Sequence, residues 1–332
     1  MNIGDIAEMA GVSRAAVSRY LNNGYISAEK RERIRRVIEE TGYQPSVMAQ
    51  TLRTKKTKLI GVVLPRIHSD AIAGVVEGIG AVLHDAGYDM LLATTDNVPE
   101  KELDYLRIFA NRRVDGIILI ATVFTKEHKK ILKEMAVPIV ITGQMLQGYP
   151  SVSHENYEAG AMLTRHLLSR GYRKIGYLGV MKEDVAVGQR RCEGCADTLL
   201  AAGIPMQAGM HVTADFSAEA GREKMQKLLS SFPEIDAVIC ATDEIAFGAM
   251  TYLKEAGKRV PEDVAVAGFD DDRIAAVTTP GITSVRFQYR KSGECSAGLI
   301  LDLIKGTEHT VKEIRLGTEL VVRGSTTGKG DT

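Results

Sequence analysis

The sequence predicts two parts of different fold class: an all-α helix-turn-helix domain at the N-terminus, and an α/β core of two lobes with parallel sheets. Residues 2–43 repeat apolar side chains at helical spacing and are interrupted by glycines. From residue 59 onward, short apolar runs of the buried-strand type alternate with helical stretches. Such alternation is typical of βαβ units. Seven such runs indicate two lobes, each with its own sheet.

Charge is unevenly distributed along a chain whose formal net charge is zero. Residues 1–58 carry 11 Lys and Arg against 6 Asp and Glu, whereas the remainder carries 31 against 36. A basic N-terminal segment on an acidic body indicates a local surface for phosphate groups. We therefore expect double-stranded DNA as a partner.

Three short helices are expected in the N-terminal segment, over residues 3–10, 13–22 and 27–42. Gly11 ends the first, and Ser13 is the expected N-cap of the second. Two helices joined by a tight turn that contains glycine form a helix-turn-helix. The second helix of this motif enters the major groove by its N-terminal end.

That N-terminal end carries candidate base-reading residues. Arg14 can offer two donors to a guanine edge, and Ala15 can contact a thymine methyl group. Ser18 lies on the same stretch. Contacts to phosphates fix the register on the duplex without reading its sequence. We expect that role from Arg19, Arg33, Arg35 and Arg36.

A short weakly apolar helix is predicted over residues 45–52, with Pro45 at its start and the basic run RTKKTK behind it. A helix of this length is marginal alone in water, and an ordinary linker is the alternative.

The core is expected to bind its ligand beyond the carboxyl ends of its strands, as open α/β sheets do. The strand-like runs are LIGVVLP, YDMLLATT, GIILIA, PIVITG, KIGYLGV, AVICAT and VAVAGFD. The candidate ligand positions that follow them are 65–69, Asp96, 121–122, Gly143, 184–187, 242–243 and 269–271.

No catalytic motif is visible, since the chain has no G-x-G-x-x-G, G-x-x-x-x-G-K-[ST] or G-x-S-x-G. The histidines show no metal-ligand spacing, and the pair Cys192 and Cys195 has no second ligand pair nearby. We therefore expect no enzymatic activity, no cofactor and no metal. The sequence has no apolar run of about 18 residues and no basic leader followed by an apolar stretch, so we expect a cytoplasmic protein without membrane spans.

The segment IGDIAEMAGVSRAAVSRYLNN resembles the N-terminal signature of the lac repressor family, with Ala16 where threonine is usual. The resemblance continues through GYQPSVMAQTLRTKKTKLIGVVLP, AVICATDEIAFGAM and GKRVPEDVAVAGFDD, and covers essentially the whole chain. It implies a core like the periplasmic sugar-binding proteins. The chain shows no long apolar heptad tail, so the resemblance implies a homodimer on a near-palindromic operator.

The resemblance also implies domain bounds and site residues. The helix-turn-helix would span 1–44, the hinge 45–58 and the core 59–328, with one lobe of 59–157 and 284–315 and the other of 158–283 and 316–327. DNA contacts would fall on Ser13, Arg14, Ala15, Ser18, Arg19, Asn22 and Tyr25, with Ala49 and Leu52 entering the minor groove. Effector contacts would fall on Pro65, Arg66, Asp96, Asn156, Val187, Arg191, Phe216, Thr242, Asp270 and Phe287.

Two segments, YLGVMKEDVAVGQRR and ICATDEIAFGA, are similar to those of the trehalose repressor branch, which senses a sugar phosphate. Arg66 is then expected to pair with a phosphate group. A neutral disaccharide such as sucrose is the alternative, and the sequence leaves open whether the effector is an inducer or a co-repressor.

The sequence thus predicts a regulator, in the main a repressor of carbohydrate-utilisation genes, whose DNA affinity responds to a bound sugar. A solute-binding receptor for a sugar transporter is the alternative, but the basic head and the absence of a signal peptide argue against it. An α/β enzyme acting on sugars would need a nucleophile, a base or a phosphate loop, which the sequence does not show.

Overall fold

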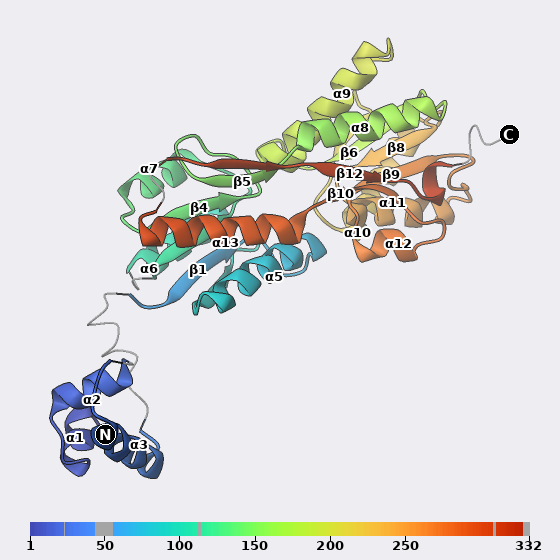
Figure 1. Ribbon diagram of the computed structural model, residues 1–332. Coiled ribbons are helices and arrows are strands. Elements are labelled where there is room, and N and C mark those ends of the chain that lie inside the picture. Colours follow the sequence, from blue (N-terminus) through green and yellow to red (C-terminus); the bar gives the residue numbers. More distant parts are fainter. Residues whose placement is uncertain (23, 44–55, 112–113, 308–309, 328–332) are drawn as a thin grey trace. The chain divides into compact units, whose positions relative to one another are not determined.

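The computed structural model describes residues 1–22, 24–43, 56–111, 114–307 and 310–327. The chain divides into two compact units, Met1–Lys58 and Leu59–Thr332, which are described separately (Figure 1).

The first unit is a bundle of helices around a small apolar core. Its described helices are α1 (Ile3–Met9), α2 (Arg14–Leu21) and α3 (Ala28–Thr41). The Ser13 side chain accepts a hydrogen bond from the Ala16 backbone at 3.2 Å, which confirms the predicted N-cap of α2. Ile6, Val17 and Ile34, one from each helix, are fully buried against one another.

The second unit contains two six-stranded sheets, which confirms the predicted fold class. The first has the order β11-β5-β4-β3-β1-β2 and the second the order β12-β10-β9-β8-β6-β7. All described pairings are parallel except β10 with β12. The strands of the first sheet are β1 (Leu59–Leu64), β2 (Asp89–Thr94), β3 (Gly116–Ile120), β4 (Ile139–Thr142), β5 (Ser151–His154) and β11 (Glu313–Leu316). Those of the second are β6 (Ile175–Gly179), β7 (His211–Thr213), β8 (Ala237–Cys240), β9 (Ala265–Asp270), β10 (Thr283–Phe287) and β12 (Thr318–Val321).

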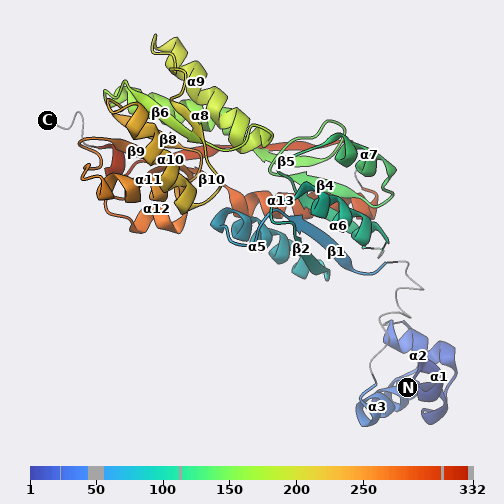
Figure 2. The same ribbon diagram turned by 180° about the vertical axis from the view of Figure 1, so that it is seen from behind.

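Helices cover both faces of each sheet (Figures 1 and 2). The first sheet lies between the pair α5 (Asp70–Asp85) and α13 (Tyr289–Lys305) and the pair α6 (Pro99–Asn111) and α7 (Lys126–Glu134). The second lies between the pair α8 (Asn156–Ser169) and α9 (Arg191–Ala201) and the pair α10 (Ala218–Ser231) and α11 (Asp243–Glu255). The remaining elements are the π-helix η1 (Val185–Arg190), α12 (Arg273–Val277) and the 3-10 helix η2 (Gly324–Thr326).

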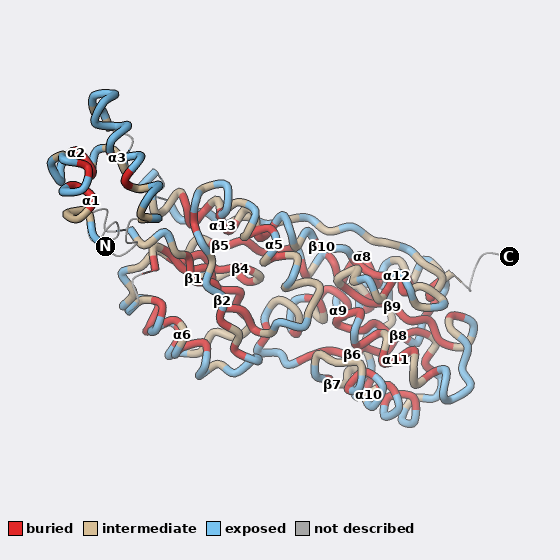
Figure 3. The backbone as a smooth tube through the Cα atoms, turned by 90° about the horizontal axis from the view of Figure 1, so that it is seen from below, coloured by how far each residue is buried: buried red, intermediate tan, exposed pale blue. Residues whose placement is uncertain are grey.

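Burial on both faces explains why the strands are continuous apolar runs. In β1, Val62 packs with the α5 and α13 side of the sheet and Val63 with the α6 and α7 side. Figure 3 shows the buried segments gathered at the centre of each lobe.

The chain passes between the two sheets after β5, after β10 and between β11 and β12. We expected residues 284–287 to belong to the first lobe, but β10 pairs with β9 and β12 in the second sheet. The sequence boundary at residue 284 was therefore one strand early. Residues 284–287 alternate between the two faces of the second sheet, and the crossing follows only at Gln288. Leu316 was expected in the second lobe, but it pairs with His154 in the first sheet. The expected boundary at residue 316 is therefore one residue early.

No helix among the described residues is long and apolar enough to span a membrane.

Candidate functional site

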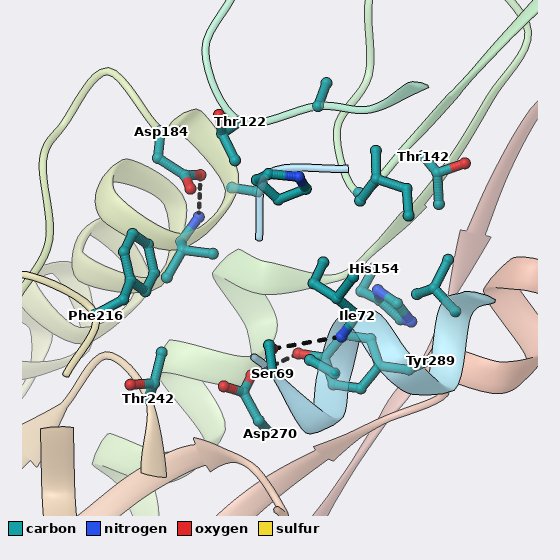
Figure 4. A pocket seen from close by; sticks show the side chains of 18 of the residues that line it. Ser69, Ile72, Thr122, Thr142, His154, Asp184, Phe216, Thr242, Asp270 and Tyr289 are labelled. Atoms are coloured by element: carbon teal, nitrogen blue, oxygen red, sulfur yellow. Dashed lines mark hydrogen bonds between the residues drawn. The ribbon is translucent and has the colours of Figure 1, made fainter. Parts of the chain in front are cut away.

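A pocket lies between the two lobes, beyond the carboxyl ends of strands from both sheets (Figure 4). The space between its lining atoms is about 770 Å³, open solvent at the mouth included. This size is in the range of small-molecule sites. Eight of the ten expected effector residues line it: Pro65, Arg66, Asn156, Val187, Arg191, Phe216, Thr242 and Asp270.

Two expected residues do not line the pocket. Asp96 forms an ion pair with Lys101 at 2.8 Å on the surface, and its neighbour Asn97 takes the lining position. Asp96 and Asn97 have φ values of 55° and 60°, so the turn after β2 directs Asp96 away from the pocket. Phe287 is buried beneath the site, with the Arg191 guanidinium 4.4 Å from the centre of its ring.

Arg191 is the most enclosed cation of the pocket, with 3 % of its surface exposed. Its Nε donates to the Asn156 side chain at 2.9 Å, and its Nη1 donates to the Ala241 carbonyl at 2.6 Å and to Asp270 Oδ1 at 3.2 Å. The guanidinium also forms a side-chain hydrogen bond with Tyr289. Burial is the largest single effect on Arg191 and lowers its pKa. The charge of Asp270 and other neighbouring groups outweigh burial, so the pKa of Arg191 is raised.

Helix packing brings Arg191 to this place. Gly160 on α8 lies against the Arg191 carbonyl so closely that a β-carbon there would overlap it, and Gly194 lies in the same way against the Tyr157 carbonyl. The two glycines therefore allow α8 and α9 to approach closely, and this approach sets the position of the first residue of α9.

Asp270, the partner of Arg191, has a φ of 107°, which is rare for a residue with a side chain. Its Oδ1 also accepts the Tyr289 hydroxyl at 2.5 Å. Because Oδ1 takes both bonds, Oδ2 is left for other donors. The site thus presents a carboxylate and a guanidinium group side by side.

Further carboxyl groups surround Asp270. Asp243 is fully buried and accepts from the Ser284 hydroxyl at 2.8 Å and the Asp272 backbone at 3.0 Å. Burial, and next the charge of Asp270, raise the pKa of Asp243 well above its ordinary value and that of Asp272 to about 8. Asp272 lines the neighbouring part of the cleft, so its raised pKa lowers the negative charge there at neutral pH.

Arg66 reaches across the cleft from the first lobe. Its guanidinium lies 4.0 Å from the centre of the Phe216 ring, which belongs to the second lobe. Burial is the main effect on Arg66 and lowers its pKa, while Asp270 and Asp184 oppose this shift. The two side chains form a cation–π contact that joins the lobes at the pocket.

Two lining residues also cap helices of the second lobe. The Thr242 hydroxyl accepts from the Ile245 backbone at 3.3 Å at the start of α11. Asp184 accepts from the Val187 backbone at 2.9 Å at the start of η1, and burial raises its pKa. Val187 is thereby fixed at the pocket wall.

Ser69, Thr122 and Asp184 also line the pocket, within the ranges expected at the strand ends. The structure adds lining residues that the sequence did not assign. They include Ile72, Val75, Thr142, His154, Tyr289 and Ser292. His154 lies at the end of β5, which is a signal that the sequence offered. Tyr289 and Ser292 lie on α13, a helix near the C-terminus that packs on the first lobe, and no local pattern reveals that packing.

In the first unit, the predicted DNA-contact residues cluster on and after α2. Arg14, Ala15 and Arg19 are exposed, Ser18 is half-buried, and Ala16 faces the core. Ser13 and Asn22 flank the helix as its caps. Tyr25 follows in the next loop with 93 % of its surface exposed. Ala49 and Leu52 lie outside the described residues.

Two of the arginines expected on phosphates have partners within the unit. Arg33 donates to the Gly11 carbonyl at 3.0 Å and so ties α3 to the turn before α2. Arg35 pairs with Glu32 and Glu39 at 2.6 and 2.7 Å. Glu32 and Glu39 partly neutralise Arg35, so the basic surface depends more on Arg14 and Arg19.

The cysteines of the C-x-x-C pair are free, and burial raises the pKa of Cys192 and raises that of Cys195 to about 12. Within the described ranges, no group of three or more His, Cys, Asp or Glu side chains is arranged to hold a metal ion.

Comparison with known proteins gives two family matches. Residues 2–46 match the bacterial regulatory proteins of the lacI family, and residues 164–326 match a periplasmic binding protein-like domain. The sucrose operon repressor of Staphylococcus xylosus is 32 % identical over 95 % of this chain and 96 % of its own length. The regulator CelR of Thermobifida fusca is 34 % identical over 96 % of both chains.

Solved structures agree with this assignment. A transcriptional regulator CelR–cellobiose complex is 31 % identical with a TM-score of 0.77, and covers 98 % of this chain and 99 % of its own. The lac repressor dimer bound to operator and an anti-inducer is 25 % identical with a TM-score of 0.90 and the same coverage. Full-length similarity to these regulators shows that the chain belongs to the lacI family of bacterial regulatory proteins and is a DNA-binding transcriptional regulator.

Proposed function

We propose that this chain is a cytoplasmic, non-catalytic repressor of carbohydrate-utilisation genes. Its operator affinity is set by a sugar or sugar phosphate bound between the core lobes. The observation that carries this proposal is the buried pair of Arg191 and Asp270, which places guanidinium donors and a carboxylate acceptor at the pocket. Neighbouring hydroxyl groups on a sugar ring offer the matching acceptors and donors.

An aromatic face supports the carbohydrate. The Phe216 ring lines the same pocket as the polar pair, and such rings pack against the apolar face of a pyranose. One relative named for sucrose and one solved with cellobiose favour a disaccharide.

The contacts of Arg66 would differ between a neutral and a phosphorylated sugar. Among the described residues it forms no ion pair, and its contact with Phe216 leaves its N–H groups for an anionic group. A phosphate would gain a charge-assisted pair there, whereas a neutral sugar would leave the Arg66–Phe216 contact intact. The similarity to the trehalose branch stays a prediction.

On the DNA side, we propose that α2 reads the major groove through Arg14 and Ala15, with Ser13, Ser18, Arg19, Asn22 and Tyr25 positioning it on the backbone. A homodimer would place two such helices on a near-palindromic operator, as the lac repressor dimer does with its operator. Ala49 and Leu52 would enter the minor groove between them.

The pocket is coupled to the DNA through the lobes. Because the chain crosses three times between the sheets, the lobes can rotate about these crossings when a ligand joins them. The first lobe is continuous with residue 58 and hence with the hinge, so such a rotation changes the separation of the two DNA-reading units of a dimer. Coupling of this kind is worth about 1–3 kcal/mol, or about 5- to 150-fold in affinity.

Two measurements test the proposal. Thermal shift of the full-length protein with sucrose, cellobiose, trehalose, glucose and glucose 6-phosphate should reveal a stabilising sugar, and Arg66→Ala should weaken only a phosphorylated one. DNA selected from a random pool should yield a near-palindromic operator whose mobility shift changes with that sugar. A chain that selects no DNA sequence, or whose operator affinity no sugar alters, would contradict the proposal.

A further inference from the structure

Two buried polar atoms in the pocket have no hydrogen-bond partner among the described residues. They are Nε2 of His154, a residue with 9 % of its surface exposed, and Oγ of Ser292, with 1 % exposed. Both residues line the pocket, and both belong to the first lobe, on β5 and α13. A buried polar atom without a partner costs free energy, so an atom that is left in this state at a pocket wall indicates a ligand or a water molecule.

The His154 ring is held in one orientation. It makes edge contacts with the Phe287 and Tyr289 rings, with centroids 5.2 and 5.4 Å apart. It also forms a hydrogen bond with the backbone of Gln288. Because Nε2 has no partner, that bond belongs to Nδ1, and the neutral ring carries its proton on Nδ1 and a lone pair on Nε2.

His154 also lies at the crossing between the lobes. It is the last residue of β5, and Gln288 lies in the second crossing, where its side chain donates to the carbonyl of Gly317 in the third at 3.1 Å. The ring is therefore joined to the segments about which the lobes turn. Figure 4 shows His154 beside Tyr289 and Ile72 at the pocket.

We propose that His154 and Ser292 form a neutral polar subsite on the first-lobe wall of the pocket, which binds a hydroxyl group of the effector. The inference rests on the proposed function, since it takes the effector to be a sugar. The sugar hydroxyl donates its proton to His154 Nε2, and the Ser292 hydroxyl donates to a sugar oxygen. Neither residue carries a formal charge in this role, so the subsite selects a hydroxyl and disfavours a phosphate or carboxylate, which cannot donate to Nε2.

Ser292→Ala gives the cleanest test, because it removes one atom that has no partner in the ligand-free protein. We expect the melting temperature without ligand to be unchanged or raised, while the affinity for the best sugar of the five-sugar panel falls about tenfold to a hundredfold. Ser292→Thr, which keeps the hydroxyl, should retain more of that affinity. Titration calorimetry on the full-length protein measures each value.

Ser151→Ala is the matched control. Ser151 on β5 is also fully buried with an unpartnered hydroxyl, but it does not line the pocket. This variant should reproduce the effect on melting temperature and leave sugar affinity unchanged. His154→Leu should behave as Ser292→Ala does toward the sugar, and the two losses should not add, because both residues hold one group.

The outcomes separate the two proposals. If the wild-type chain binds a sugar and Ser292→Ala binds it equally well, the subsite is wrong, the orphan atoms hold only water, and the proposed function stands. A loss of ligand-free stability in Ser292→Ala, with no loss of affinity beyond that of Ser151→Ala, would likewise show a structural role. If no sugar of the panel stabilises the wild-type chain, the proposed function and the subsite fail together.

Discussion

At the scale of single residues, the central feature of the pocket is a buried ion pair. Arg191 and Asp270 have side chains with 4 % and 8 % of their surface exposed. A buried pair of this kind contributes little net stability as a whole, but removal of one partner leaves an uncompensated charge. The pair therefore serves to hold the two polar groups in a fixed arrangement.

Asp270→Asn tests this view. The amide has the same shape but no charge, so the Arg191 guanidinium stays buried without a counter-ion. We expect a loss of about 3 kcal/mol in the free energy of unfolding, measured by urea denaturation, together with loss of sugar binding. Asp215→Asn, an exposed position of the same lobe, should change neither value. A destabilisation below about 1 kcal/mol would show that the pair is hydrated.

His154 gives a second prediction at this scale. Burial, and after it the charge of Arg191, lowers its pKa from 6.5 to about 4, with Asp270 and the Gln288 backbone opposing. The folded state binds the proton more weakly than the unfolded state. The contribution of the neutral His154 ring to the free energy of unfolding is therefore complete above pH 6.5. It is lost as the pH falls from 6.5 to about 4. The shift corresponds to about 3 kcal/mol.

Urea denaturation between pH 7.5 and 4 should show this loss, and His154→Gln should show less of it. Burial also lowers the pKa of His166 and His211, so a part of the pH dependence must remain in the variant. The exposed His68→Gln should follow the wild type. Parallel curves for wild type and His154→Gln would exclude a buried neutral ring.

At the scale of elements, glycine pairs allow three helix pairs to approach closely. Gly78 and Gly293 join α5 to α13, Gly160 and Gly194 join α8 to α9, and Gly221 and Gly248 join α10 to α11, with the position of each β-carbon taken by a backbone atom of the opposite helix. Such contacts cannot yield as a flexible side chain does. The close approach is a property of the pair and not of either helix.

Gly160→Ala should therefore displace the backbone of Arg191. We expect a loss of about 1–3 kcal/mol in stability and a weakened sugar affinity, measured by denaturation and calorimetry. Gly298→Ala is the control, because its β-carbon would meet no atom within 4 Å in the interior of α13. That change should be neutral or stabilise by up to about 1 kcal/mol. Equal effects of the two substitutions would contradict the packing argument.

The elements also show what sequence can and cannot supply. Ser13 and Gly42 mark helix ends through local chemistry, so the boundaries of α2 and α3 follow from the sequence alone. Tyr289 and Ser292 reach the pocket only because α13 returns to the first lobe, and that contact has no local signal. Asp96 was placed one residue off because two consecutive positive φ values turn the chain after β2.

At the scale of the whole core, an ion pair spans the mouth of the cleft. Arg273 at the start of α12 donates to Asp70 at the start of α5 at 3.0 and 3.1 Å and lowers the pKa of that carboxyl. Their side chains are 89 % and 38 % exposed, so the pair adds little to stability. The Arg273–Asp70 pair can form only when the two lobes are close together. It therefore favours the closed arrangement of the lobes over an open one.

Asp70→Asn should leave the free energy of unfolding within about 0.5 kcal/mol of the wild type. Sugar affinity should fall about two- to fivefold in low salt, and the difference should shrink at about 1 M salt, where surface charges are screened. Asp85→Asn, at the far end of α5, should change neither affinity nor its salt dependence. A salt-independent loss in Asp70→Asn would indicate a direct ligand contact instead.

The order of strands in the first sheet has a consequence for synthesis on the ribosome. Its edge strand β11 and its covering helix α13 lie some 130 residues or more beyond β5 in the chain. Until those segments emerge, β5 lacks its outer neighbour β11, and the apolar side chains around Val62 and Ile118 lack the part of their cover that α13 provides. The first lobe therefore stays incomplete while most of the second lobe is synthesised. During that time its exposed strand edge and apolar surface are open to unwanted strand pairing.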